Sequence, residues 1–348
     1  MVKFVDVMPP RDPAEVHRAS TPLELLFDLA TVIAIAACAA GLHHGLAEGH
    51  AVDAIVKFAI AFFAVWWAWM NYTWFASAYD NNDAVFRMAT FVIIGGAVTV
   101  ASGIDALFDD LDLRLVIVGY VVMRLPLALL WLRAARGDPA RRSTSLIYAA
   151  GLVLVQSYWA SMLALPALPQ RLLIGAIAAG FVLELVVPIL AERRANTPWH
   201  HDHIEERYGL LTIIVLGEVL LAAALSLRTA GSGDFEIGFV HIAMSALVVT
   251  GAMWWLYFPG GRHLHSHKLP DALAWGYGHV LIFGAVASVG AGFSLLVDIV
   301  AGKAEASLAT GDLAVGVPLA LYMFGLWLVR DRHLLEGRGA MSCSYSPS

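Results

Sequence analysis

The chain alternates long apolar stretches with short polar segments. With about 20 apolar residues taken as one membrane crossing, the apolar runs lie at residues 22–45, 53–75, 85–104, 113–133, 143–164, 171–191, 207–227, 237–258, 272–299 and 312–330. These runs are continuous and about twice as long as the strands of a membrane barrel, so they predict helices. The expected fold is all-α: a polytopic bundle of about ten transmembrane helices.

Lysine and arginine placement supports this count, because short cytoplasmic loops hold an excess of both. Sixteen lie in the two termini and the even-numbered loops, whereas the opposite loops hold only Arg114, Arg171, Arg228 and Lys303. The bias predicts a multi-pass protein of the cell membrane with both termini cytoplasmic.

The expected domain organisation is one membrane domain with two polar ends. Residues 1–20 form a cytoplasmic N-terminal segment, 21–330 a single transmembrane domain, and 331–348 a cytoplasmic tail. The first residues lack the basic and apolar layout of a cleaved signal peptide, so we expect the segment to remain on the mature protein.

Similar segments recur at near-constant offsets along the chain. FVIIGGAV at Phe91 resembles HVLIFGAV at His279, a Trp pair at 66–67 recurs at 254–255, and Glu24 precedes its apolar run as Glu206 does. This predicts parallel repeats of the first four and last four helices, 21–135 and 203–333, joined by the helices in 143–191. The alternative is chance recurrence of small and aromatic residues, which all membrane helices use.

Composition excludes several classes of protein. Apolar residues make up 59% of the 348-residue chain and charged residues 14%, against roughly 45–50% and 25% in soluble domains. The net charge of −6 is no signature of nucleic-acid binding. With only two cysteines, Cys38 and Cys343, neither a disulfide framework nor a cysteine zinc site is available.

Three charged residues fall near the middle of predicted helices: Arg124, Glu184 and Glu218. A charged side chain at this depth costs free energy in the bilayer, so it faces the bundle interior or water. Such residues are therefore functional candidates. One cation and two carboxylates predict one ion pair and one spare carboxyl group. The structural alternative is a buried ion pair that only fixes helix register.

A second group of charges lies at the predicted cytoplasmic helix ends. Glu24 and Asp28 share a helix face by their i, i+4 spacing, and so do Asp83 and Arg87. Arg207 and Glu218 are also nearly on one face, which predicts a polar stripe that runs inward. Capping and ion pairing are the simpler explanation for the acidic turn. The whole group comprises Glu24, Asp28, Asp80, Asp83, Arg87, His203, Glu206 and Arg207.

Thirteen histidines raise the question of metal binding. They cluster with Asp202 on one cytoplasmic loop and alone on the next, but their spacing matches no established ligand signature. The prediction is therefore no metal site. His279, inside the ninth run, is a better candidate for handling protons. The clustered residues are His200, His201, Asp202 and His203, and then His263, His265 and His267.

Three ordered motifs resemble one protein family. TPLELLFDLATVIAIA from Thr21, WWAWMNYTWFASAYDNNDAVFR from Trp66 and HIEERYGLLTIIVLGE from His203 are similar to the bacterial low-temperature-requirement A family. The resemblance implies an integral membrane protein without an assigned biochemical activity. It points to Glu24, Asp28, Asp80, Asp83, Arg87, His203, Glu206, Arg207 and Glu218.

The leading functional hypothesis is a secondary transporter or permease. Glu24, Asp28, Arg124, Glu184, Glu218 and His279 would form a ligand or proton site, and Asp80, Asp83, Arg87, His203, Glu206 and Arg207 a cytoplasmic gate or cluster. One alternative is a membrane-embedded enzyme that uses Asp28 or Glu218 as a buried acid on a lipid or isoprenoid-like substrate. Another is a non-catalytic factor for growth in the cold.

The expected partners are the lipid bilayer and an unidentified small-molecule or lipid-like ligand, with no nucleic acid. The sequence does not identify a cofactor, and it leaves open whether the chain forms a homo-oligomer.

Overall fold

The computed structural model describes residues 4–15, 18–165, 168–230, 237–258, 264 and 269–332. Over these residues the chain is all-helical, without strands, and ten of its helices are long and apolar enough to cross a membrane. They are α1 (Pro22–Ala47), α2 (Ala51–Tyr79), α3 (Ala84–Asp110), α4 (Arg114–Gly137), α5 (Arg142–Met162), α6 (Gln170–Glu192), α7 (His201–Ala230), α8 (Ile237–Tyr257), α9 (Leu269–Val300) and α10 (Leu308–Leu326). The expected all-α bundle is confirmed.

Helix boundaries follow from capping residues. Asp83 caps α3 by accepting a 2.8 Å hydrogen bond from the Phe86 amide, as an extended N-cap aspartate does. The C-cap of α3 is Leu111, which has a left-handed conformation (φ 55°). Its backbone N–H donates to the carbonyl oxygens of Ala106 and Leu107 in the last turn of the helix. Short single-turn elements follow α4 and α10, at Pro139–Arg141 and Trp327–Asp331.

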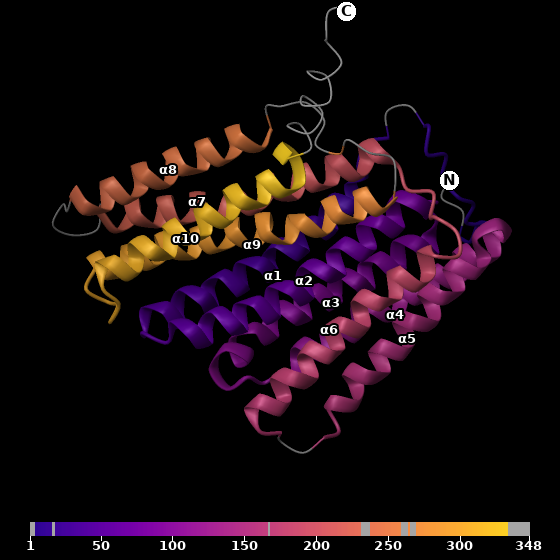
Figure 1. Ribbon diagram of the computed structural model, residues 1–348, viewed down its shortest axis with the longest axis horizontal. Coiled ribbons are helices and arrows are strands. Elements are labelled where there is room, and N and C mark those ends of the chain that lie inside the picture. The colour runs from indigo at the N-terminus through magenta and orange to yellow at the C-terminus, as the bar shows by residue number, and fades with distance from the viewer. Residues whose placement is uncertain are drawn as a thin grey trace, which may run out of the picture. The chain divides into compact units, whose positions relative to one another are not determined.

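The chain forms two compact units. The first comprises Met1–Cys38 and Ala59–Arg207, and the second Ala39–Phe58 and Tyr208–Ser348. In the first unit α3 packs against α4, α4 against α5 and α5 against α6; Figure 1 labels these helices. In the second unit α9 packs against α8 and α10.

Aromatic side chains of α2 form much of the core of the first unit. Trp66, Trp67, Trp69, Tyr72 and Phe75 are almost completely buried. Successive turns of α2 thus carry large side chains inward, and two of the indole N–H groups need buried acceptors. Those acceptors turn out to be carboxylates of the candidate site.

Glycine positions set the closest helix approach. A Cβ on Gly96 of α3 would lie 2.7 Å from the Gly119 carbonyl oxygen of α4, and one on Gly119 would lie 2.6 Å from the Val100 nitrogen. The sequence pattern places a small-residue ridge on Gly95, Thr99 and Gly103. Gly103 does face α4, but Gly95 faces open space, and Gly96 makes the close contact in its place.

Candidate functional site

One buried charge network joins α1, α2 and α7 within the first unit. Arg207 Nη2 donates to Asp28 Oδ1 at 2.5 Å, and its Nη1 lies 3.2 Å from Glu24 Oε1. His203 Nε2 is 3.1 Å from the same Glu24 oxygen. Asp28 also accepts a 2.7 Å hydrogen bond from Trp69 Nε1. We call Glu24, Asp28, Trp69, His203 and Arg207 the Arg207 network.

Helical spacing explains why these side chains meet. Glu24 and Asp28 are one turn apart on α1, and His203 and Arg207 are one turn apart on α7, so each helix presents one polar face. The four titratable side chains are completely buried. Asp28 Oδ2 and Arg207 Nε make no hydrogen bond, which leaves capacity for another partner.

A second network joins α2, α4, α5 and α6. Arg124 Nη2 donates to Glu184 Oε2 at 2.6 Å, and Trp67 Nε1 donates to that oxygen at 3.0 Å. Gln156 donates to Glu184 Oε1 at 3.1 Å. The Arg124 guanidinium carbon lies 5.4 Å from the centre of the Tyr120 ring, within cation–π range. We call Trp67, Tyr120, Arg124, Gln156 and Glu184 the Arg124 network.

The two networks share α2, which sends Trp67 into one and Trp69 into the other. Residues two apart on a helix point in nearly opposite directions. Because both networks are otherwise built from different helices, α2 is the element that connects them.

Glu218 lies apart from both networks, in the second unit. Its side chain is partly buried, and it neither accepts a hydrogen bond nor forms an ion pair with any described residue. A Cβ on Gly290 of α9 would come within 3.1 Å of the Glu218 Cβ. Between Arg207 and Glu218 the same face of α7 carries Leu211 and Ile214, so the expected continuous polar stripe is interrupted by apolar side chains.

His279 is a fully buried histidine of α9 with both ring nitrogens engaged. Nδ1 lies 2.8 Å from the Trp275 carbonyl oxygen and Nε2 3.1 Å from the Tyr257 hydroxyl. A carbonyl accepts only from a protonated nitrogen, so the neutral Nδ1–H form fits these partners. The ring also packs against Tyr208 and Phe283. This is the environment of a structural histidine.

The acidic turn between α2 and α3 is closed by the N-terminal segment. Asp83 pairs with Arg133 of α4 and also accepts from the Asp6 amide at 2.8 Å. Arg87 instead donates to Asn82 at 2.9 Å. The i, i+4 spacing of Asp83 and Arg87 therefore does not produce an ion pair, because Arg133 takes the Asp83 carboxylate.

Asp80 and Asp83 have pKa values shifted in opposite directions. Burial, reinforced by the charge of Glu24, raises the pKa of Asp80 to about 6. At Asp83 burial acts in the same sense but is outweighed by hydrogen bonds from Arg133 and the Phe86 amide, which lower the pKa. Asp80 accepts from the Asn82 amide at 2.7 Å, which holds the turn.

Arg18 and Glu206 are two further charged residues, and both lie outside the two networks. Arg18 is buried and donates to the Ala76 and Ser77 carbonyls at the end of α2, a cationic cap that sequence reasoning did not single out. Glu206 is exposed and accepts from the Ser20 amide at 3.3 Å. It belongs to the surface, whereas His203 and Arg207 on the same helix point into the Arg207 network.

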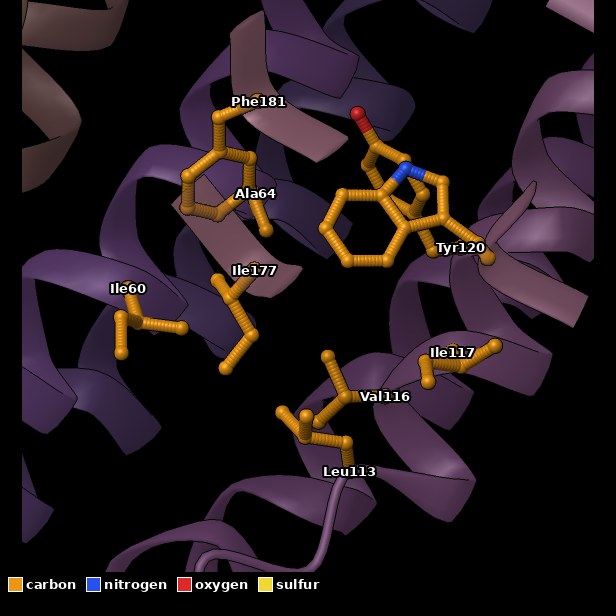
Figure 2. A pocket seen from close by; sticks show the side chains of 9 residues that line it. Ile60, Ala64, Leu113, Val116, Ile117, Tyr120, Ile177 and Phe181 are labelled. Atoms are coloured by element: carbon orange, nitrogen blue, oxygen red, sulfur yellow. The ribbon is translucent and has the colours of Figure 1, made fainter. Parts of the chain in front are cut away.

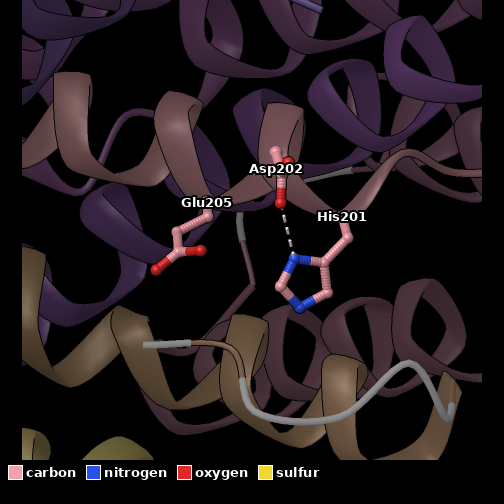
Figure 3. Close-up of side chains that lie close together, drawn as sticks. All are labelled: His201, Asp202 and Glu205. Carbon is pink, nitrogen blue, oxygen red and sulfur yellow. Dashed lines mark hydrogen bonds and ion pairs between the residues drawn. The ribbon is translucent and has the colours of Figure 1, made fainter. Parts of the chain in front are cut away.

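The histidine side chains at the start of α7 contact different partners. His201, Asp202 and Glu205 place ligand atoms within 4.8 Å of one another, and His201 Nδ1 lies 3.3 Å from Asp202 Oδ1 (Figure 3). His200, by contrast, contacts the Glu15 carbonyl, and His203 contacts Glu24. No second observation points to an ion among these residues, so the expectation of no metal site is kept as a prediction. His263, His265 and His267 lie outside the described residues.

Sequence reasoning missed several members of the networks. Gln156 had a detectable signal, because it is a lone amide in an apolar run. Trp67 and Trp69 were expected only as aromatic lining for a cationic intermediate in the enzyme alternative, and not as hydrogen-bond donors to carboxylates. Arg133, which lies outside both networks, was counted among the loop cations and not as the partner of Asp83. Their partners depend on helix rotation, which the sequence does not display.

Comparisons with known proteins agree with the motifs. The chain is 28% identical over 329 residues to an uncharacterized protein of Rhizobium meliloti (strain 1021), a match that covers 90% of this chain and 77% of the relative. No solved structure matches the chain. The family model described as "Bacterial low temperature requirement A protein (LtrA)" matches residues 19–345. The chain is thus a multi-pass membrane protein that belongs to the LtrA family.

Proposed function

We propose that this protein is a secondary transporter or permease of the cell membrane. The observation that carries the proposal is the presence of two buried charge networks inside one helical unit, both connected to α2. Buried charges in a membrane protein cost several kcal/mol on insertion scales (about 2.5–3.5 each) and mark ligand or ion pathways more often than simple packing.

The Arg207 network supports a role in proton-linked gating. Glu24, Asp28 and Arg207 together carry one net negative charge when ionised. A proton on His203 or on a carboxyl group makes the buried network neutral, so its lowest-energy state includes one exchangeable proton. In this proposal the network closes the cytoplasmic side until that proton or a ligand arrives.

Glu218 is the proposed second proton carrier. Among the described residues it has no ion-pair partner, unlike Glu24, Asp28 and Glu184. A carboxyl group in a spanning helix that no cation neutralises is suited to exchange a proton during a transport cycle. The sequence predicts one ion pair and one spare carboxyl group. In this proposal the ion pair is Arg124 with Glu184, and the spare carboxyl group is that of Glu218.

One observation favours an enzyme as the second candidate. The Asp28 carboxylate accepts a hydrogen bond from the Trp69 indole, and the ring of the preceding residue, Phe27, lies 4.4 Å from that of Tyr72. A buried acid with aromatic neighbours fits chemistry through a cationic intermediate of a lipid-like substrate.

Untargeted mass spectrometry of cells and medium, analysed separately, distinguishes the two. Cells express the wild-type chain, Glu218→Gln, the matched exposed-loop variant Glu305→Gln or no protein, at equal membrane levels. Transport predicts unchanged masses redistributed between cells and medium by the wild type and Glu305→Gln, and at least about tenfold less by Glu218→Gln. A new mass made only by active chains would establish the enzyme and overturn transport. If no difference appears, a non-catalytic factor becomes the better explanation.

A further inference from the structure

The segment before α1 is folded against one end of the first unit. Its described residues, 4–15 and 18–21, lie outside the helices, and we call them the strap. Met8 of the strap is only 1% exposed. The Asp6 amide donates to the Asp83 carboxylate of the turn between α2 and α3 at 2.8 Å. The strap is therefore docked on the unit by both apolar burial and hydrogen bonds.

Two arginines of the strap provide donors for the last backbone carbonyls of α2. Arg18 donates through Nη1 to the Ser77 carbonyl, and through Nη2 to the Ala76 carbonyl at 2.7 Å. The backbone N–H of Arg11 donates to the Ala78 carbonyl at 2.9 Å. The last four carbonyls of an α-helix lack acceptor partners within the helix. The strap thus supplies donors that water would have to replace if the strap left.

A line of buried polar side chains leads from this point to the Arg207 network. Ser77, Thr73 and Trp69 of α2 follow one another at i, i+4 spacing, so they share one face of the helix. Thr73 Oγ1 lies 3.5 Å from Arg207 Nη2, and Trp69 donates to Asp28. All five side chains are fully buried.

His200, directly before α7, lies at the outer end of this line. Its backbone N–H donates to Ser77 Oγ at 3.0 Å, and its Nδ1 accepts from the His203 amide at 3.3 Å. The ring proton is therefore on Nε2, which donates to the Glu15 carbonyl of the strap at 2.7 Å. We call the buried side chains of this line the polar lane: Trp69, Thr73, Ser77, His200, His203 and Arg207.

The strap also continues directly into the Arg207 network. Thr21 and Glu24 form a capping box at the start of α1. Glu24 Oε2 accepts from the Thr21 amide at 2.8 Å, and Thr21 Oγ1 accepts from the Glu24 amide at 3.3 Å. The other Glu24 oxygen faces His203 and Arg207. A displacement of the strap at Thr21 therefore removes a hydrogen bond from a carboxylate of the network.

Two cavities of the first unit lie away from the polar lane. The small apolar one, about 30 Å³, is lined by Ile60 and Ala64 of α2 and by Tyr120 of α4, among others (Figure 2). A larger hollow, about 450 Å³, lies between the turn that follows α3 and the ends of α5 and α6. Neither includes a residue of the lane. Among the described residues, the lane therefore ends at Ser77 and His200, where the strap binds.

We propose that the strap is a movable closure of the first unit, held in place by Arg18. The docked strap keeps water and ligands away from the Arg207 network, and its release opens the polar lane between α2 and α7. The proposal rests on the transport function, because alternating access requires that the network be closed from one side at a time.

The thiol reactivity of Thr73→Cys measures the opening of the lane. The full chain, with Cys38 and Cys343 replaced by alanine, is placed in lipid nanodiscs and treated with a small water-soluble methanethiosulfonate. A buried cysteine reacts only while its site is open, so the reaction rate follows the open population. Ala191→Cys, a second buried position near the end of α6, reports general loosening of the unit.

Two variants release the strap by different means. Arg18→Gln removes the guanidinium that donates to two carbonyls of α2. Gly137→Ala adds a methyl group at the end of α4, where it overlaps the Met8 carbonyl of the strap. We expect each variant to raise the reaction rate of Thr73→Cys at least about tenfold.

Matched controls leave the strap docked. Arg142→Gln changes an exposed arginine at the start of α5, and Gly175→Ala adds a methyl group in open space on α6. Both should leave the rate at Thr73→Cys at the parental value. Neither the release variants nor the controls should change the rate at Ala191→Cys.

Three outcomes would overturn the closure. The first is a parental rate at Thr73→Cys in both release variants. The second is an increase in Arg18→Gln alone, because it would show only the loss of a helix cap. The third is an equal increase at Ala191→Cys, which indicates loosening of the whole unit. An increase in Gly137→Ala alone would refute Arg18 as the residue that holds the strap.

The cell assay of solute redistribution separates this proposal from the transport function. If the release variants open the lane but the wild type redistributes no solute, the closure stands and transport is refuted. If the wild type redistributes a solute while the rate at Thr73→Cys does not depend on the strap, transport stands and the closure is refuted.

Discussion

At the scale of single residues, the acidic turn shows how burial and pairing oppose each other. Asp80 and Asp83 are three residues apart and both almost fully buried. The Asp83 carboxylate pairs with a cation, Arg133, whereas Arg11 donates only to the backbone carbonyl of Asp80. The two carboxyl groups therefore respond to pH with opposite sign.

Asp80→Asn is expected to stabilise the protein at neutral pH. The Asp80 carboxyl titrates near 3.8 when unfolded and about 6 when folded, so the folded state holds its proton more tightly. Stability is consequently lost as the pH rises from about 4 to 6, by at most about 3 kcal/mol. Asparagine keeps the acceptor for the Asn82 amide without the charge. Thermal unfolding in nanodiscs should show a gain at neutral pH and none at about pH 4.

Asp83→Asn supplies the control, with the opposite sign. The lowered pKa of the Asp83 carboxyl group stabilises the folded state at pH values above the ordinary aspartate pKa. This contribution disappears as the pH falls through the pKa of the folded state. The variant should therefore be less stable than the parent at neutral pH. A shift of both variants in the same direction would contradict the assignment of these two groups.

At the scale of elements, α3 and α4 pack as closely as their backbones allow. The approach depends on the absence of a side chain at Gly96 and Gly119. In lipid, where apolar burial gives little drive to helix association, such close packing supplies much of the contact energy.

Gly96→Ala should separate α3 from α4 and destabilise the first unit by about 1–3 kcal/mol, since the added methyl group meets Met123 and the Gly119 carbonyl. The neighbouring Gly95→Ala points its methyl group into open space and should stay within about 0.5 kcal/mol of the parent. Steric trapping or thermal unfolding of both variants measures the difference. Equal stability of the two would exclude this helix contact.

At the scale of the whole molecule, the apolar run lengths predicted the fold because the bilayer thickness fixes helix length. Ten runs became ten helices among the described residues. The Asp83 cap was readable too, because capping is local. The charge partners were less accessible: Arg124 could pair with either Glu184 or Glu218, and only tertiary packing selects Glu184.

Helices that are apolar on nearly every face give no signal for their rotation about the axis, which explains the remaining errors. Gly95 of the expected ridge on α3 faces open space, although Gly103 of the same ridge packs against α4, and the partner of Asp83 was sought on its own helix. The internal repeat and the orientation of the termini stay predictions.

Cysteine labelling tests that orientation in a cysteine-free background. With both termini cytoplasmic, Arg193→Cys lies inside and Lys303→Cys outside; both side chains are exposed. A membrane-impermeant maleimide should label only Lys303→Cys in intact cells, and both after lysis. The reverse pattern would invert the topology, and labelling of both in intact cells would refute the span count.

The indole donors of α2 have a further consequence. Trp67 and Trp69 each donate an N–H to a buried carboxylate, and the emission colour of an indole depends on the electric field of adjacent charge. A gain or loss of a proton at Glu184 or Asp28 therefore reaches a chromophore through a single hydrogen bond. Each network thus contains its own optical reporter, and with the other nine of the eleven tryptophans replaced, its protonation can be followed by fluorescence without an attached dye.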